Sequence, residues 1–131
     1  MIEVSGYLNP PKELFKAVNA VADNSFCRCL SADEITTLPT IPSWSPDRHT
    51  NTCLRLRNVE PHTDDFIGLG RPKTWRGMFW LLRGNLWIQA GADAQEMSSG
   101  DWVLFDDTVN HCVVAEKQWV GIAVQYVRSE G

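Results

Sequence analysis

The sequence has 131 residues, a formal net charge of −4 and six tryptophans. This length suits one domain and is too short for two independent cores. The acidic balance argues against non-specific binding to nucleic acid or membranes, because both need an excess of lysine and arginine facing phosphate. No stretch approaches the roughly 20 apolar residues that span a bilayer, and the first residues lack the pattern of a signal peptide. We therefore expect a cytoplasmic protein with a small-molecule partner.

The first part of the chain, to about Thr50, has an irregular pattern. Alternating apolar residues in Ile2–Leu8 predict a short strand. After a pair of prolines, apolar residues recur at helical spacing in Lys12–Asp23 and predict the one clear helix. Asp23–His49 contains three prolines among Ser, Thr and Asp, which indicates a loop. A loop of this length serves either as a lid over a site or as a structural wrap, and the sequence does not decide between them.

From Cys53 onward the pattern changes to a period of two, as in half-buried strands. The expected features that follow are a buried strand over Met78–Arg83, a tight hairpin at Arg83-Gly84-Asn85, a turn at Gly91-Ala92-Asp93, a strand opened by Gly100-Asp101, a turn at Asp106-Asp107-Thr108, and strands over His111–Val114 and Val120–Val127. Several short strands with regular turns indicate a sandwich or closed barrel. We expect one domain, 1–131, with a helix and loop wrap over 1–51 and a β-barrel core over 52–131. Trp80, Trp87 and Trp102 are expected in the core.

Three residues have the chemistry of a metal site. His62 and Asp64 lie two residues apart, so an extended backbone presents both on one face. His111, from a distant strand, adds a third ligand. Two imidazoles and one carboxylate leave positions open on Fe(II), as an oxygen-activating site requires. The pattern predicts that His62, Asp64 and His111 bind a divalent metal, with Fe(II) favoured.

The stretch from Leu54 to Val127 resembles the double-stranded β-helix shared by cupins and Fe(II)/2-oxoglutarate-dependent oxygenases. The residues that carry the resemblance are Leu81-Leu82-Arg83-Gly84-Asn85-Leu86-Trp87-Ile88, similar to the central cupin hairpin, and Gly100-Asp101-Trp102-Val103-Leu104-Phe105 with His111, similar to the second cupin motif. His62-x-Asp64 with a distal histidine resembles the oxygenase triad. The resemblance implies a mainly β, jelly-roll, cupin-like barrel with one N-terminal helix.

The oxygenase resemblance also implies roles for the site residues. His62, Asp64 and His111 would be catalytic iron ligands, and a basic residue downstream of the distal histidine would bind the far carboxylate of 2-oxoglutarate. A guanidinium suits this task because it makes a bidentate ion pair. Arg128 is the candidate, with Arg55, Arg57, Arg76 and Arg83 as alternatives. The chain departs from the usual metal cupin, which has His-x-His followed by a glutamate, and it is small for an oxygenase.

Three functions are compatible with this pattern. The first is an Fe(II)/2-oxoglutarate-dependent dioxygenase that hydroxylates a substrate C–H bond. The second is a cupin-type metalloprotein that does not use 2-oxoglutarate. The third is a non-catalytic module that binds a ligand or protein on the same barrel, because one fold hosts many chemistries. Exposed strand edges or tryptophans would support a homodimer, which nothing in the sequence specifies.

Overall fold

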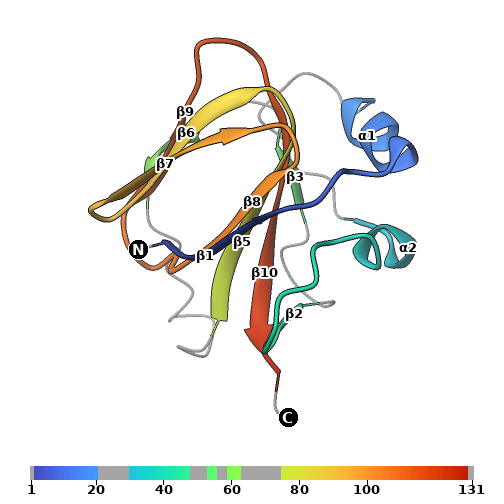
Figure 1. The fold of residues 1–131 in the computed structure, drawn as a ribbon, viewed down its shortest axis with the longest axis horizontal. Coiled ribbons are helices and arrows are strands. Elements are labelled where there is room, and N and C mark those ends of the chain that lie inside the picture. The colour runs from blue at the N-terminus through green and yellow to red at the C-terminus, as the bar shows by residue number, and fades with distance from the viewer. Residues whose placement is uncertain (1, 21–29, 48–52, 56–58, 63–74, 130–131) are drawn as a thin grey trace.

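The computed structural model describes residues 2–20, 30–47, 53–55, 59–62 and 75–129, with the backbone alone described at 53–55 and 59–62 (Figure 1). The described helices are α1 (Lys12–Asn19) and α2 (Ala32–Ile35). The described strands are β1 (Ile2–Tyr7), β2 (Trp44–Pro46), β3 (Cys53–Arg55), β4 (Val59–His62), β5 (Trp75–Arg83), β6 (Asn85–Ala90), β7 (Asp93–Ser98), β8 (Asp101–Phe105), β9 (His111–Val114) and β10 (Val120–Arg128). Across these ranges no helix has the length and apolar character needed to cross a membrane.

The strands form two antiparallel sheets that face each other. The large sheet has the order β1-β8-β5-β10-β2, with β3 also paired to β10, and the small sheet has the order β4-β9-β6-β7. Consecutive strands from β3 to β8 alternate between the sheets, apart from β6 and β7, which form a hairpin in the small sheet. In Figure 1 the small sheet, with β6, β7 and β9, arches over the strands β8 and β5 of the large sheet, and the interior cluster of side chains lies between the two sheets.

The pairing identifies the barrel as a double-stranded β-helix. The outgoing strands β3, β4, β5 and β6 pair with the returning strands β10, β9, β8 and β7 respectively. The chain is therefore a long antiparallel ribbon, folded back at the β6–β7 turn and wound into a coil. Two further ladders, β5 with β10 and β6 with β9, join successive turns of that coil. The mainly β, jelly-roll, cupin-like architecture expected from the sequence is confirmed.

The tight hairpin expected at Arg83-Gly84-Asn85 is wrong. β5 and β6 lie in different sheets, so the chain turns a corner there instead of reversing within one sheet. Gly84 has φ +119°, and a Cβ at this position would lie 3.1 Å from the Cβ of Trp119. A hairpin and a corner both require a glycine with positive φ, so the local sequence does not distinguish them.

The part of the chain before Thr52 contributes more than the expected helix and loop. β1 pairs with β8 at one edge of the large sheet, and β2 pairs with the end of β10. α1 ends at Asn19, earlier than predicted. The expected loop also contains α2, which begins with a capping box: the Ser31 side chain accepts from the Glu34 amide, and the Glu34 side chain accepts from the Ser31 amide.

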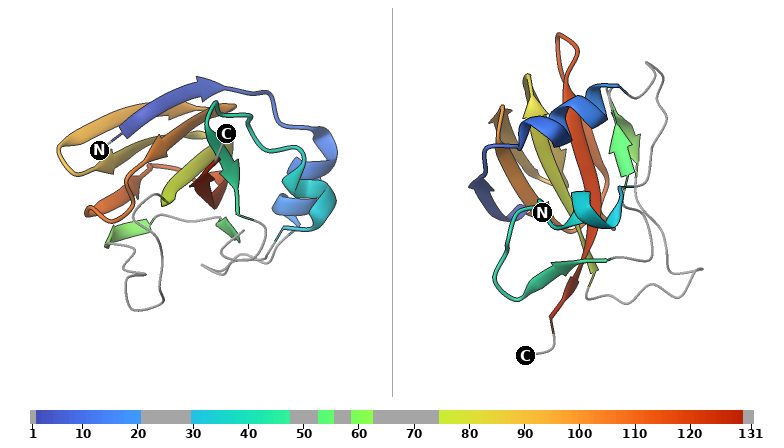
Figure 2. Two further views of the ribbon diagram at one scale, coloured as in Figure 1. Left: turned by 90° about the horizontal axis from the view of Figure 1, so that it is seen from below. Right: turned by 90° about the vertical axis from the view of Figure 1, so that its right-hand side faces the viewer.

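The large sheet is buried on both faces. Its inner face and the small sheet enclose the interior cluster, whose buried members are Phe79, Leu81, Leu86, Ile88, Ala90, Met97, Val103, Phe105, Val113 and Trp119. Its outer face packs under α1, α2 and residues 38–41, visible at one side of the barrel in Figure 2. This helix-side cluster consists of Leu14, Val18, Leu30, Ile35, Leu38, Ile41, Met78, Trp80, Leu82, Trp102, Leu104, Ile122, Val124 and Tyr126.

The three tryptophans expected in the core differ in their burial. Trp80 and Trp102 belong to the core as expected. Trp87 does not, because its side chain is 49% exposed on the outer face of the small sheet. The neighbours Leu86 and Ile88 point inward, so the alternation of β6 turns Trp87 to solvent.

Tyr126 attaches the loop to the large sheet. Its side chain is fully buried, and its hydroxyl donates a hydrogen bond of 2.8 Å to the carbonyl of Pro39. Burial raises the pKa of Tyr126 well above its ordinary value, so the hydroxyl remains a donor at any physiological pH. Leu38 and Ile41 flank the bonded residue and are buried in the helix-side cluster. The described part of the loop, residues 30–47, therefore packs as a structural wrap on the large sheet.

Replacing Tyr126 with Phe should lower the free energy of unfolding by about 1–3 kcal/mol, because the Pro39 carbonyl would remain buried without its donor. Urea unfolding measures this change. Tyr7→Phe is the matched control: Tyr7 is 65% exposed, so the control should stay within about 0.5 kcal/mol of the parent chain. Equal effects of the two substitutions would contradict a role for the Tyr126 hydroxyl.

Candidate metal and ligand site

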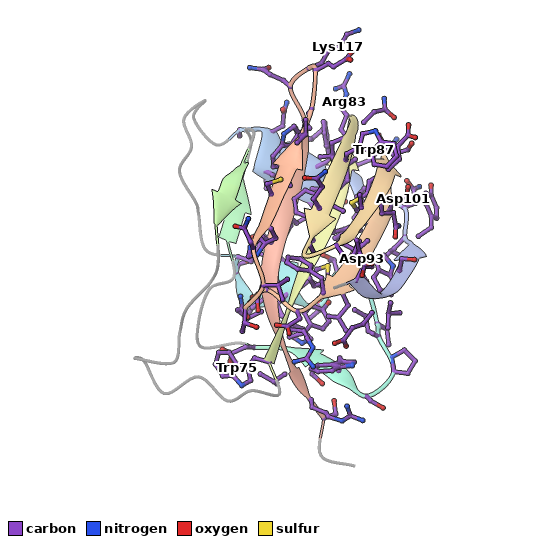
Figure 3. All side chains as sticks on the ribbon, turned by 90° about the vertical axis from the view of Figure 1, so that its left-hand side faces the viewer. Trp75, Arg83, Trp87, Asp93, Asp101 and Lys117 are labelled. Carbon is purple, nitrogen blue, oxygen red and sulfur yellow. The ribbon has the colours of Figure 1, made fainter. Side chains whose placement is uncertain are left out.

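The buried polar side chains Asp107, His111 and Gln125 lie at one end of the barrel. β5 begins there at Trp75 and ends at Arg83 at the opposite end, where Lys117 also lies (Figure 3). Register places Val127 of β10 opposite Trp75, and Phe105 of β8 opposite Gly77. We call this the Trp75 end. It holds the start of β5 and the ends of β8 and β10.

His111, the first residue of β9, belongs to the barrel interior. Its side chain is 7% exposed, and its ring meets the Phe105 ring edge-on at 5.1 Å between centroids. Nδ1 lies 2.8 Å from the carbonyl oxygen of Val109. Since a carbonyl only accepts, Nδ1 carries the proton in the neutral ring, and the lone pair is on Nε2. A histidine that ligates a metal commonly has this arrangement, with the other ring nitrogen donating to a carbonyl.

His62 is the last residue of β4, and its Cα is paired with that of His111. The fold therefore brings the backbones of these two sequence-predicted ligands side by side, although they lie 49 positions apart in the chain. Asp64 lies outside the described residues. Within the described side chains, no three His, Cys, Asp or Glu residues come together as a possible metal site.

The turn before β9 is held at several points. The Asp106 carboxylate accepts hydrogen bonds from the Thr108 amide at 3.0 Å and from the Thr108 hydroxyl at 2.6 Å. The Asn110 carbonyl accepts from the Gly91 amide at 2.9 Å, which ties the turn to the β6–β7 hairpin. These bonds set where β9 begins, and so where the backbone of His111 lies.

Burial by itself would raise the pKa of Asp106, but the two hydrogen bonds from Thr108 and the positive charge of Arg76 outweigh it, and the pKa is lowered. A lowered carboxyl pKa stabilises the fold above the unfolded-state pKa. That contribution is lost as pH falls through the folded-state pKa. The turn is therefore held at neutral pH and loosens only in acid.

The Thr108 amide resonance should titrate with a midpoint below 3.8, the ordinary value for an aspartate, because this amide donates to the Asp106 carboxylate. An acid titration followed by ¹⁵N–¹H NMR measures the midpoint. In the control variant Asp106→Asn this titration should be absent. A midpoint at or above 3.8 would contradict the stabilised carboxylate.

Asp107 and Gln125 form a buried polar pair that the sequence did not single out. Asp107 is fully buried and Gln125 is 6% exposed. The Gln125 side-chain amide donates to Asp107 Oδ2 at 2.7 Å. Gly77 is opposite Gln125 in the ladder, and a Cβ there would lie 3.1 Å from Asp107 Oδ2. The glycine thus leaves the room that the carboxylate occupies.

The sequence contains one feature that could have predicted the buried pair of Asp107 and Gln125. Gly121, Ala123 and Gln125 share a face of β10, and the first two are small residues against the interior cluster. A glutamine at the next inward position of an otherwise apolar strand is unusual, because a buried amide needs hydrogen-bond partners. The alternation alone does not show which face is inward.

Arg128 lies on the other face of β10. It follows Ile122, Val124 and Tyr126 in the alternation, and these three belong to the helix-side cluster. Its guanidinium stacks over the Trp44 ring at 5.6 Å from the ring centroid. The structure therefore does not bring Arg128 to the face of the barrel that carries His111.

The comparisons with known proteins concern fold. No protein-family model matches this sequence, and no curated protein matches it. Similar solved structures include the cupin domain of Cnp3 from Schizosaccharomyces pombe, with 10% identity and a TM-score of 0.45 over 70% of this chain and 57% of that one. This chain thus spans a little over half the length of the Cnp3 chain.

Two further similar structures are KdgF from Halomonas sp. and a conserved protein of unknown function, SPY1581, from Streptococcus pyogenes. KdgF has 13% identity and a TM-score of 0.42 over 71% of this chain and 86% of that one. The Streptococcus protein has 11% identity and a TM-score of 0.44 over 86% of this chain and 100% of that one. The fold assignment above rests on the strand pairing, and function is argued from the residues.

Proposed function

We propose that this chain is a metal-dependent oxidoreductase whose Fe(II) is held by His62, Asp64 and His111. The observation that supports it is the pairing of His62 with His111, together with the bond from His111 Nδ1 to the Val109 carbonyl. That bond leaves Nε2 as the nitrogen with ligand chemistry. Residues that are paired across an antiparallel ladder lie on the same face of the sheet. The proposal is therefore that His62 and His111 bind the same ion.

The donor set suits the proposed metal. Imidazole nitrogen and carboxylate oxygen are ligands of Fe(II), and two histidines with one carboxylate leave positions open for small molecules. Bound there, the metal would supply the oxidative chemistry on a substrate. The His111 ring is positioned by its edge-on contact with the Phe105 ring and by its hydrogen bond to the Val109 backbone carbonyl. Phe105 belongs to the interior cluster, so the ring lies against apolar side chains.

The finer form of the proposal is a dioxygenase that uses 2-oxoglutarate as cosubstrate, for which the sequence predicted Arg128 as the carboxylate anchor. One observation favours the second candidate, a cupin-type metalloprotein without 2-oxoglutarate. The three arginines with described side chains stack on rings of the helix side: Arg76 and Arg128 over Trp44, and Arg83 over Phe15. If 2-oxoglutarate is used, Arg55 or Arg57 is the alternative anchor.

Metal binding tests the ligand set. We expect the parent chain to bind Fe(II) under anaerobic conditions, and His62→Ala and His111→Ala to weaken binding by more than about 100-fold, beyond the usual cost of losing an outer-shell partner. Calorimetric titration measures the affinity, and circular dichroism checks that each variant folds. The matched control is His49→Ala, which removes the third histidine of the chain and should leave the affinity unchanged.

Full Fe(II) affinity in the His111→Ala variant would refute the ligand set. Failure of the parent chain to bind Fe(II), Mn(II), Ni(II) or Zn(II) would refute the proposed function and favour a non-catalytic binding module. The exposed Trp87 and Val114, opposite each other on the outer face of the small sheet, would then be its first surface to test.

The visible charge-transfer band of an Fe(II)–2-oxoglutarate complex tests the cosubstrate. We expect Arg128→Ala to leave the 2-oxoglutarate response of the iron-loaded protein unchanged, because its guanidinium lies on the face of β10 away from His111. Loss of a bidentate anchor would instead weaken binding roughly 10- to 100-fold. Arg83→Ala is the matched control, because it also removes an arginine that stacks on an aromatic ring, and it should leave the 2-oxoglutarate response unchanged. A band in the parent that Arg128→Ala abolishes would establish Arg128 as the anchor.

A further inference from the structure

A groove lies between α1 and α2 on the outer side of the large sheet, where the two helices lie beside each other (Figure 2). Its volume is about 560 Å³, within the range of natural ligand sites. The residues that line it are Pro11, Glu13, Leu14, Ala17, Ser31, Asp33, Glu34 and Thr37. The groove is therefore separate from the barrel interior, to which His111 belongs.

The apolar part of the groove comes from α1 and the residue that precedes it. Leu14 is buried in the helix-side cluster, whereas Pro11 and Ala17 are half-buried and keep some surface in the groove. The side chain of Ala17 is a single methyl group, so it leaves a hollow that a larger side chain would fill. Covering apolar surface is favourable in proportion to its area. An apolar side chain of a partner would therefore be stabilised in this hollow.

Most of the polar groups in the groove bond within the chain. Ser31 and Glu34 bond each other through the capping box, and the Thr37 hydroxyl donates to the Glu34 carbonyl at 2.6 Å. The carboxylates of Glu13 and Asp33 differ, because both are exposed and have no hydrogen-bond or ion-pair partner among the described residues. These two carboxylates are therefore the groups that a partner can bind.

The charges in the groove have one sign. Three of the eight lining residues are acidic and none of the eight is basic. A carboxylate in the first turn of a helix is favourable in any case, which accounts for the positions of Glu13 and Asp33. It does not account for the lack of basic residues, since Lys12 and Lys16 belong to α1 and lie outside the lining. Such a surface repels phosphate and carboxylate groups and attracts ammonium and guanidinium groups.

We propose that the groove between α1 and α2 docks a segment of a partner protein in which apolar side chains lie between lysines or arginines. The apolar side chains fill the hollow at Ala17, and the basic groups pair with Glu13 and Asp33. A protein segment suits this groove better than a free small molecule does, because small-molecule sites enclose most of the ligand surface. The exposed Glu13, Ser31 and Asp33 show that this groove is open to solvent.

The docking site goes beyond the proposed metal centre and does not depend on it. The large sheet lies between the two, with α1 and α2 packed on its outer face and the interior cluster on its inner face. The chain can therefore bind a partner protein whether or not a metal is bound.

Three tetrapeptides test the docking site on the full chain. Acetyl-Lys-Leu-Leu-Lys-amide has both proposed features, acetyl-Glu-Leu-Leu-Glu-amide reverses the charge, and acetyl-Lys-Ser-Ser-Lys-amide lacks the apolar side chains. Each is titrated against ¹⁵N-labelled protein while the backbone amides of Ala17 and Thr37 are followed by NMR. We expect saturable shifts with the first peptide and an affinity about tenfold above that of the other two, the combined effect of two exposed ion pairs or of two partly buried leucines.

Glu13→Gln combined with Asp33→Asn removes both free charges and leaves the capping box of α2 intact. This double variant should lower the affinity for the Lys-Leu-Leu-Lys peptide about tenfold. The matched control is Glu96→Gln combined with Glu116→Gln, which makes the same change in net charge at exposed carboxylates outside the groove. The control should leave the affinity unchanged.

A second variant tests the apolar part. Ala17→Phe places a ring in the hollow and should abolish saturable binding of the peptide. Asn19→Phe is its control, because Asn19 is exposed on the same helix and does not line the groove. Thermal unfolding checks that each variant folds.

A preference for the Lys-Leu-Leu-Lys peptide that the charge variant and Ala17→Phe both reduce supports the docking site. Equal affinities for the three peptides, no response to any of them, or an unchanged affinity in the charge variant would each overturn it. Hexylamine is the small-molecule probe. If hexylamine binds the groove as tightly as the peptide does, the groove takes a small organic cation and the docking of a protein segment is refuted.

Discussion

The antiparallel ladder between β5 and β10 is the interaction on which the rest of the structure depends. It joins two turns of the folded-back ribbon, and both of its faces are buried. Side chains on one face line the barrel, and those on the other face pack under the helices. Adjacent residues of β10 therefore have unrelated tasks: Gln125 binds Asp107 inside, while Tyr126 bonds the Pro39 carbonyl outside.

The ladder also explains why the buried polar pair Asp107–Gln125 lies at the Trp75 end. Toward Arg83 its inner face carries Phe79, Leu81 and small partners, and packing there is apolar. Toward Trp75 the inner face has Gly77, which leaves room for the Asp107 carboxylate and the Gln125 amide. A buried carboxylate and amide are poor sources of stability compared with apolar packing.

The proposed metal centre depends on two features of the structure. One is the register of β4 with β9, which pairs His62 with His111. The other is the bond from His111 Nδ1 to the Val109 carbonyl, which sets the tautomer of the ring.

The sequence by itself determined the strands, most of the turns and the candidate ligands, because period-two alternation and glycine turns are local properties. It placed the ends of β8 and the start of β9 correctly, and His111 with them. Only the tertiary structure decided that Gly84 is a corner between sheets, that β1 and β2 join the barrel, and that Trp87 faces solvent. It also separated Arg128 from His111 and brought Gln125 to Asp107. The last two facts depend on which face of β10 is inward, and a strand whose two faces are both buried carries no local mark of that choice.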